Sequence, residues 1–196
     1  SFRDGYAQIN CVFFGNTAAI GSGAIRPSPD LAAGLDVINC IFAGNTAAQG
    51  GVMKAELSAG TGSLLRLTNC TFASNEASGD GGAMWCDYGS GPTVRNCVLW
   101  NNADADGTDG PAQIFVAGGA PVVNYSLVQG GWSGAGGIGV INSNPLLVLV
   151  PNPGPDGNWD GVNDNYGDLR PASGSPAVDA GDNGAVPSGD VADLGG

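Results

Sequence analysis

Short stretches of alternating apolar and polar residues occur along the first two thirds of the chain. Residues 35–38 and 65–68 alternate in this way before a repeated asparagine, and after it Cys40 and Phe42 continue with the opposite parity. A period of two is typical of β-strands that bury one face. A change of parity needs one residue in the left-handed conformation, which asparagine tolerates better than most residues. We therefore predict two short strands joined by a bend at each repeated asparagine.

The alternating stretches belong to a sequence repeat. Its copies begin at Asn10, Asn39, Asn69 and Asn96, and a fifth copy without the cysteine begins at Asn124. The asparagines are 29, 30, 27 and 28 residues apart. A glycine-rich step, as at residues 50–52 and 81–83, opens a third short strand. Three strands per coil of this length predict an all-β fold, a right-handed parallel β-helix of about five coils with an irregular C-terminal cap. We expect its asparagines to stack and bond to one another.

The repeat resembles a known family. Phe-x-x-Asn at Phe13–Asn16, Phe42–Asn45 and Phe72–Asn75, paired with Gly-Gly-Val or Gly-Gly-Ala, is similar to the repeat of chlamydial polymorphic outer membrane proteins and of many large secreted bacterial β-helix proteins. The resemblance covers about residues 1–128. It implies a β-helix, and the best-known members of the family are adhesins.

A different signature follows the repeat. Residues 144–147 and 167–182 are similar to the tail of "choice-of-anchor" secreted bacterial β-helix proteins, in which a β-helix precedes an anchoring segment. We therefore predict two parts, β-helix repeats over 1–141 and a capping segment over 142–196 that closes the last coil. The resemblance also implies a secreted protein, and we interpret the chain as a mature piece of a longer one.

The composition excludes several classes of function. Six basic and eighteen acidic residues give a net charge of −12, which disfavours nucleic-acid binding. The chain has no histidine, so the commonest general base and transition-metal ligand is missing. No apolar run is long enough to cross a membrane. We expect a monomeric extracellular protein on a bacterial cell surface.

The repeated cysteines predict a column of free thiols. In-register strands lie about 4.8 Å apart, whereas a disulfide needs Cβ atoms about 3.8 Å apart in a staggered geometry. We therefore expect buried free thiols at Cys11, Cys40, Cys70, Cys97 and also Cys86.

The outer face of the strand after the Gly-Gly step is the first candidate site. If Met53 and Ala55 point inward, the outward side chains of this strand and the next are Lys54, Glu56, Trp85 and Asp87. An aromatic platform flanked by charges suits the binding of a sugar chain. The alternative is catalysis by Lys54, Glu56 and Asp87 as a polysaccharide lyase or hydrolase, for which paired carboxylates are required. Charges of alternating sign are also typical of a solvated face.

The second candidate is a calcium loop. Oxygen ligands at positions 1, 3, 5 and 9, with glycine at position 6, are supplied by Asp156, Asn158, Asp160 and Asp164. The usual glutamate at position 12 is missing, and an ordinary surface turn is the alternative. Residues 104–109 form a weaker candidate of the same kind.

An apolar outer face follows each repeated asparagine. One row comprises Val12, Ile41, Thr71 and Val98, and the next comprises Phe14, Ala43, Ala73 and Trp100. Exposed, these rows would mark a contact surface. The other interpretation is that the C-terminal segment folds back over them through its apolar run at 146–150.

Together these observations predict a non-catalytic extracellular β-helix module of a bacterial surface or secreted protein. It would act as an adhesion or glycan-binding surface or as a rigid stalk, and its partner would be a glycan or a surface protein. A polysaccharide lyase or glycoside hydrolase fragment is the alternative function.

Overall fold

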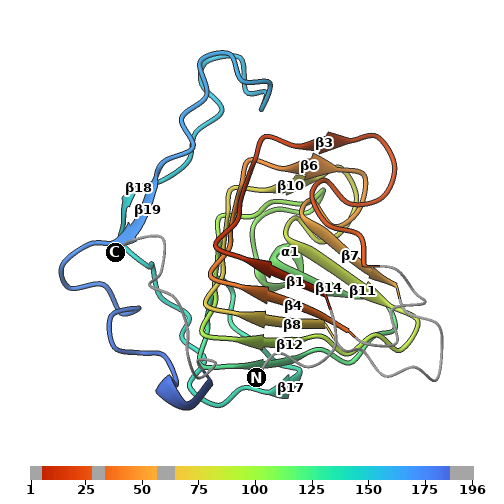
Figure 1. Cartoon of the computed structure of the whole chain (residues 1–196). Helices are drawn as coiled ribbons and strands as arrows, with labels where there is room; N and C mark the ends of the chain where they lie inside the picture. The colour runs from red at the N-terminus through yellow and green to blue at the C-terminus, as the bar shows by residue number, and fades with distance from the viewer. Residues whose placement is uncertain (1–5, 28–33, 57–64, 186–196) are drawn as a thin grey trace.

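The repeats stack as a parallel β-solenoid of about four turns, with a small antiparallel pair of strands near the C-terminus. This computed structural model describes residues 6–27, 34–56 and 65–185. Figure 1 shows the turns stacked on one another and the C-terminal arm running along one side of the stack. The predicted all-β fold class is thus confirmed.

Each turn contributes strands to parallel sheets in which neighbouring strands belong to successive turns. The first sheet has the order β1 (Tyr6–Ile9), β4 (Leu35–Ile38), β8 (Leu65–Thr68), β12 (Thr93–Arg95), β15 (Val122–Asn124) and β17 (Ala135–Gly136). The second sheet comprises β2 (Val12–Phe14), β5 (Ile41–Ala43), β9 (Thr71–Ala73), β13 (Val98–Trp100) and β16 (Leu127–Val128). The third comprises β7 (Met53–Glu56), β11 (Met84–Asp87) and β14 (Ile114–Val116).

A fourth, narrow sheet differs from the three predicted sheets. It consists of two-residue strands, namely β3 (Thr17–Ala18), β6 (Thr46–Ala47) and β10 (Glu76–Ala77). These strands follow the asparagine of Phe-x-x-Asn and are too short to produce a visible alternation. Periodicity therefore could not reveal them.

The predicted bend between the first and second sheets is present. The φ angles at the repeated asparagines are 53° at Asn10, 52° at Asn39, 55° at Asn69 and 54° at Asn96. The predicted start of the fifth copy is wrong by one residue, because Asn124 pairs with Arg95 and not with Asn96. The left-handed residue of that turn is Tyr125, with a φ of 48°.

The asparagines of the bend occupy matching positions in successive turns, as expected, but within the described residues their side chains do not bond to one another. A different set of asparagines forms the hydrogen-bonded ladder. Asn16, Asn45, Asn75 and Asn102, the last residues of Phe-x-x-Asn and its fourth-turn counterpart, bond side chain to side chain. Each Nδ2 donates to the Oδ1 of the next turn at 2.8, 2.8 and 2.7 Å. By contrast, the Oδ1 atom of Asn39 at the bend is buried without a hydrogen-bond partner.

Apolar side chains of like kind stack inside the solenoid. The rings of Phe13 and Phe42 are parallel with centroids 4.9 Å apart, and those of Phe42 and Phe72 follow at 4.8 Å. The cysteines of the described residues are free thiols, as predicted. Cys11, Cys40, Cys70 and Cys97 form a second column in the core, and Cys86 lies apart on β11. Their Sγ atoms lie 3.1–3.3 Å from backbone carbonyls two residues earlier in Cys40, Cys70 and Cys97.

The described part of the C-terminal segment flanks the solenoid and does not stack on its last turn. It contains the antiparallel strands β18 (Leu147–Leu149) and β19 (Asp168–Pro171) and a 3₁₀ helix at Asn183–Ala185. The last turn is instead closed by Trp132 and Val140, which pack against the core. The tail contacts Gly44 and Phe14 of early turns, and Asn96 exchanges two hydrogen bonds with the backbone of Asp182.

The arm covers part of the apolar outer rows with aromatic side chains, while Val12 stays 47% and Phe14 39% exposed. Tyr166 stacks on Phe14, and Trp159, only 7% exposed, lies against Gly44. The run at 146–150 does not do this, because Leu146, Val148, Leu149 and Val150 are 41–53% exposed. The expectation that the tail folds back over Phe14 is confirmed, but the tail residues named for the contact, 146–150, were wrong.

The helical elements are short. Neither the short helix α1 (Gly110–Gln113) nor the 3₁₀ turn, the helical elements of the described ranges, has the length and hydropathy that a bilayer crossing requires.

Candidate functional site

The four predicted side chains on the third sheet come together as expected. Trp85 pairs in register with Lys54, and Asp87 pairs with Glu56. The glycines before these strands allow this close stacking, because a Cβ on Gly51 would overlap the carbonyl oxygen of Gly82. The Gly-Gly step therefore fixes where each strand of this face begins.

Lys54 and Trp85 form the centre of the face. The Nζ atom of Lys54 lies 4.5 Å from the centroid of the Trp85 ring, a cation–π contact. The Lys54 side chain is 15% exposed and Trp85 is 7% exposed, so little of the indole is open to a ligand. In this structure the tryptophan orders the lysine and presents only a small aromatic area.

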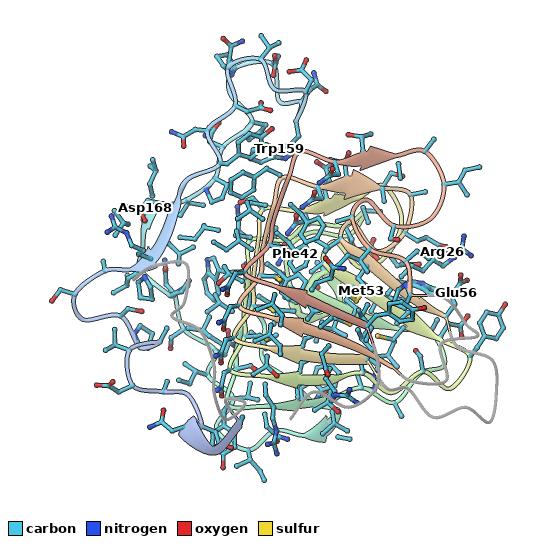
Figure 2. The ribbon with its side chains drawn as sticks, in the orientation of Figure 1. Arg26, Phe42, Met53, Glu56, Trp159 and Asp168 are labelled. Carbon is cyan, nitrogen blue, oxygen red and sulfur yellow. The ribbon has the colours of Figure 1, made fainter. Side chains whose placement is uncertain are left out.

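Glu56 is held by two cations. Its carboxylate oxygens lie 2.9 Å from Lys54 Nζ and 2.9 Å from Arg26 Nη2. Arg26 and Glu56 are close together at the edge of the third sheet in Figure 2. Sequence analysis missed Arg26, although the repeat could have indicated it. Ile25 pairs in register with Met53, which places Arg26 level with Lys54.

The charge state of Glu56 limits its chemistry. Partial burial alone raises the pKa of this carboxyl, but the hydrogen bonds and charges of Lys54 and Arg26 outweigh burial and lower the pKa overall. A general acid needs a raised pKa near the working pH. Asp87 accepts a hydrogen bond from the backbone N–H of Tyr88 at 2.7 Å. Glu56 is thus better suited to electrostatic binding than to proton donation.

The face continues to Phe115 on β14, which pairs in register with Trp85. Beyond Phe115 a groove of about 820 Å³ lies between β14 and the loop at 130–134. It is lined by Asp109, Gly110, Pro111, Ile114, Phe115, Val116, Gly130, Gly131, Trp132, Ser133 and Gly134. Lys54, Trp85 and Phe115 form one outward row that ends at this groove; we call the row and groove the third-sheet face.

Sequence analysis also missed Phe115 and Trp132. In the third turn Ala83 leads directly to Met84 and Trp85, whereas in the fourth turn the helix α1 inserts Gln113 before Ile114 and Phe115. Allowing for one inserted residue would have aligned Phe115 with Trp85. Nothing in the repeat indicated that Trp132 lines the same groove as Phe115.

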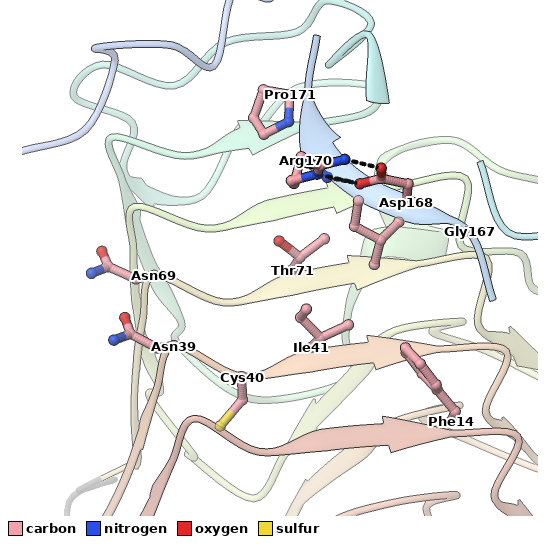
Figure 3. A pocket seen from close by; sticks show the side chains of 11 residues that line it. Phe14, Asn39, Cys40, Ile41, Asn69, Thr71, Gly167, Asp168, Arg170 and Pro171 are labelled. Carbon is pink, nitrogen blue, oxygen red and sulfur yellow. Dashed lines mark hydrogen bonds and ion pairs between the residues drawn. The ribbon is translucent and has the colours of Figure 1, made fainter. Parts of the chain in front are cut away.

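A second cavity of about 520 Å³ lies between the arm and the second sheet (Figure 3). Ile41 and Thr71 line it from the solenoid, and Asp168 and Arg170 line it from β19. Arg170 donates two hydrogen bonds to Asp168, at 2.9 and 2.6 Å. This hydrogen bonding lowers the pKa of Asp168 to about 2. The charged pair is self-contained, so the cavity offers mainly apolar contacts.

The predicted calcium ligands lie in one loop of the arm, where their oxygens accept hydrogen bonds from nearby groups. Asp156 accepts from Asn158 N–H at 3.0 Å, Asp160 from Val162 N–H at 2.8 Å, and Asp164 from Gly161 N–H at 2.7 Å. Within the described ranges no three His, Cys, Asp or Glu side chains converge as a metal site. Calcium binding stays a prediction, which the dependence of the melting temperature on added calcium tests.

The weaker candidate at 104–109 contains a turn. Asp104 Oδ1 accepts hydrogen bonds from the N–H groups of Asp106 and Gly107 at 3.0 and 3.2 Å. This arrangement is the usual role of aspartate at the start of a turn.

Comparisons of the chain with protein-family models, with curated proteins and with solved structures gave no match. The β-solenoid fold is therefore established by the structure alone. The resemblance to polymorphic outer membrane protein repeats and to choice-of-anchor tails stays a prediction.

Proposed function

We propose that this chain is a non-catalytic glycan-binding module of a secreted or surface-exposed bacterial protein, and that the third-sheet face is its binding site. The observation that carries the proposal is the groove beside Phe115 and Trp132, which continues the row of Lys54 and Trp85. Its volume of about 820 Å³ is within the usual range for ligand sites.

The chemistry of this face fits a sugar chain. Aromatic rings offer flat apolar surfaces that cover the C–H faces of sugars, and nearby polar groups bond to hydroxyls. Phe115 and Trp132 supply the rings, and Asp109 supplies an exposed carboxylate at the rim. The Lys54 ammonium, held over Trp85, adds one ordered donor.

The charge of the protein favours a neutral or amino-sugar glycan. The net charge of −12 repels polyanions at long range, and the groove itself is lined by an aspartate and no basic residue. An acidic polysaccharide would instead need a cluster of cations. Lys54 and Arg26 do not supply one, because both are paired with Glu56.

An extracellular location and a monomeric state belong to the same proposal. The resemblance of the repeat supports the first. The thiols are compatible with an oxidising compartment, because Cys40, Cys70, Cys86 and Cys97 are buried in the described structure and cannot meet the thiols of other molecules. The arm supports the second, since its Tyr166 and Trp159 cover part of the apolar outer rows, a surface that would otherwise favour association.

A glycan array carrying neutral, amino-sugar and acidic glycans tests the proposal. We expect saturable binding to a group of neutral or amino-sugar glycans and none to the acidic ones. Binding to no glycan would favour the rigid-stalk function instead, and selective binding to acidic glycans would contradict the charge argument.

A depolymerisation assay separates binding from catalysis. We expect no new reducing ends and no unsaturated products when the protein is incubated with polysaccharides, including acidic ones. Product formation that is lost in Glu56→Gln would establish the alternative function, that of a polysaccharide lyase or hydrolase.

A further inference from the structure

The two ends of the asparagine ladder differ. At one end, Asn102 Nδ2 donates to Gln113 Oε1 at 2.7 Å. Gln113 is fully buried, and its Nε2 atom lies 3.0–3.3 Å from the carbonyl oxygens of Asn102, Thr108 and Asp109. The amide of Gln113 is thus fully used within its own turn. This end of the ladder is terminated.

The other end of the ladder, at Asn16, is open. Asn45 and Asn75 each accept, through Oδ1, hydrogen bonds from both the backbone N–H and the Nδ2 of the preceding turn's asparagine. Asn45 also donates from Nδ2 to the carbonyl of Phe13 in the preceding turn. Within the described residues, Asn16 makes no such hydrogen bond on the side that faces away from the second turn, and it is exposed. Its amide therefore retains one acceptor and one donor facing away from the solenoid.

The first turn also has backbone N–H groups that face the same side of the solenoid as the free edge of Asn16. Cys11 O accepts from Ile41 N–H and Gly15 N–H donates to Ala43 O, so these odd-numbered positions face the second turn. By the alternation of a parallel ladder, the N–H groups of Val12 and Phe14 face the open side. β1, β2 and β3 all lie at the ends of their sheets, at the same end of the stack (Figure 1).

This edge lacks the features that protect edge strands. No residue from 6 to 25 is charged or a proline, although the chain as a whole has a net charge of −12. Charged side chains, prolines and bulges are the usual means of preventing pairing at a sheet edge. Phe13, the end of the phenylalanine stack, is only partly buried, whereas Phe42 and Phe72 are completely buried. The edge has the chemistry of an internal turn.

We propose that this end of the solenoid is a docking surface for one further coil of the same repeat type, with strands parallel to β1, β2 and β3. Its asparagine would lie over Asn16 and donate its backbone N–H and Nδ2 to Asn16 Oδ1, while Asn16 Nδ2 donates to a carbonyl of the new coil. Its phenylalanine would stack on Phe13. A second copy of this chain cannot offer its other end, because Gln113, Trp132 and Val140 close that end.

The test adds a coil to the full chain. A copy of residues 34–58 placed directly before Ser1 puts the copied Asn45 ahead of Asn16 by 29 residues, the natural separation of Asn16 and Asn45. The control is the same extension with the copied Phe42→Ser and Asn45→Ala. The readout is hydrogen exchange at the Val12 and Phe14 amides. We expect exchange to slow about 100-fold or more with the native coil, because both amides become paired, and far less with the control.

Two outcomes overturn the proposal. One is unchanged exchange at Val12 and Phe14 in the extended protein, which would show that the edge does not accept a coil. The other is dimerisation of the unextended chain at micromolar concentration, in sedimentation velocity, with protection of the same two amides. That result would make the occupant a second copy.

Discussion

The rings of Phe14 and Tyr166 are stacked, with their centroids 4.7 Å apart and an angle of 3° between their planes. Phe14 belongs to the first turn of the solenoid and Tyr166 to the C-terminal arm. Trp159 stacks beside Tyr166 at 5.5 Å and lies against Gly44 of the second turn. Three aromatic rings thus hold the arm to the apolar outer rows of the second sheet.

Gly44→Ala is expected to displace the arm. A Cβ at this position would overlap the ring of Trp159, and the φ of 64° is unfavourable for alanine. Gly157→Ala is the matched control, because Gly157 has a similar φ of 73° and no atom within 4 Å of the added Cβ. We expect Gly44→Ala to lower the free energy of unfolding by about 2 kcal/mol more than Gly157→Ala.

Urea unfolding measures this difference, and limited proteolysis reports the release of the arm. Equal destabilisation by the two substitutions would contradict the packing of Trp159 on Gly44.

Asn75→Ala is expected to lower the free energy of unfolding more than substitution of a bend asparagine does. Asn75 is 1% exposed, donates to Asn102 Oδ1 and Phe42 O, and accepts from Asn45. Its loss leaves several buried groups without partners, at about 3 kcal/mol or more.

Asn69→Ala, by contrast, should cost about 1 kcal/mol, because only the left-handed backbone at φ 55° disfavours alanine. Asn69→Gly should be nearly neutral, since glycine adopts this conformation freely, whereas Asn75→Gly should not rescue the ladder. Denaturant titrations of the four variants test the distinction. A cost for Asn69→Ala as large as that for Asn75→Ala would refute it.

Glu56→Gln is expected to destabilise the protein at neutral pH and not at low pH. Lys54 and Arg26 lower the pKa of Glu56 in the folded state below 4.5, its ordinary value. The stabilisation is therefore present above the unfolded-state pKa and is lost as the pH falls through the folded-state pKa. Because the group is partly solvated, the effect should stay below about 1 kcal/mol. Unfolding measured across pH checks this; a cost of the same size at low pH and at neutral pH would contradict the pairing of Glu56 with Lys54 and Arg26.

The thiols are expected to differ in reactivity. Burial raises the pKa of Cys86 to about 12, and burial also raises that of Cys70 well above its ordinary value. Cys11 is only partly buried. At pH 8 an alkylating reagent should modify Cys11 alone in the folded protein and all five cysteines after unfolding. Rapid modification of Cys86 in the folded state, or a disulfide between Cys40 and Cys70, would contradict the structure.

The sequence was sufficient to predict the solenoid because its signals are local and repeated. The alternation at 35–38 indicated which side chains are buried, and the asparagine between strands indicated the left-handed bend. Both follow from backbone geometry that each copy must satisfy separately. Which asparagine of a copy bonds to the next turn depends on the direction of its side chain. Asn39 and Asn45 stand on either side of the short strand β5, and only the structure showed that the side chain of Asn45 points inward.

The contacts of the arm and of the third-sheet face could not be predicted in the same way. Trp159 contacts Gly44 and Tyr166 contacts Phe14, although the partners are far apart in the sequence. The period of the repeat does not connect them. The apolar run at 146–150 was the stronger hydrophobic signal, yet isolated aromatics make the contact. In the site, Lys54, Glu56, Trp85 and Asp87 followed from strand register. Arg26 holds the same repeat position as Lys54 and could have been found in this way, whereas Phe115 follows an inserted residue and Trp132 lies in a loop.

The most direct test of the proposed function is the affinity of Phe115 variants for a glycan selected on the array. Isothermal titration should show binding at least about 10-fold weaker for Phe115→Ala, equivalent to about 1.4 kcal/mol. Phe115→Tyr, which keeps the ring, should bind like the unmodified chain, and so should Tyr6→Ala, which removes an exposed aromatic ring on the first sheet. Equal affinity of Phe115→Ala and the unmodified chain would contradict the assignment of the third-sheet face as the glycan site.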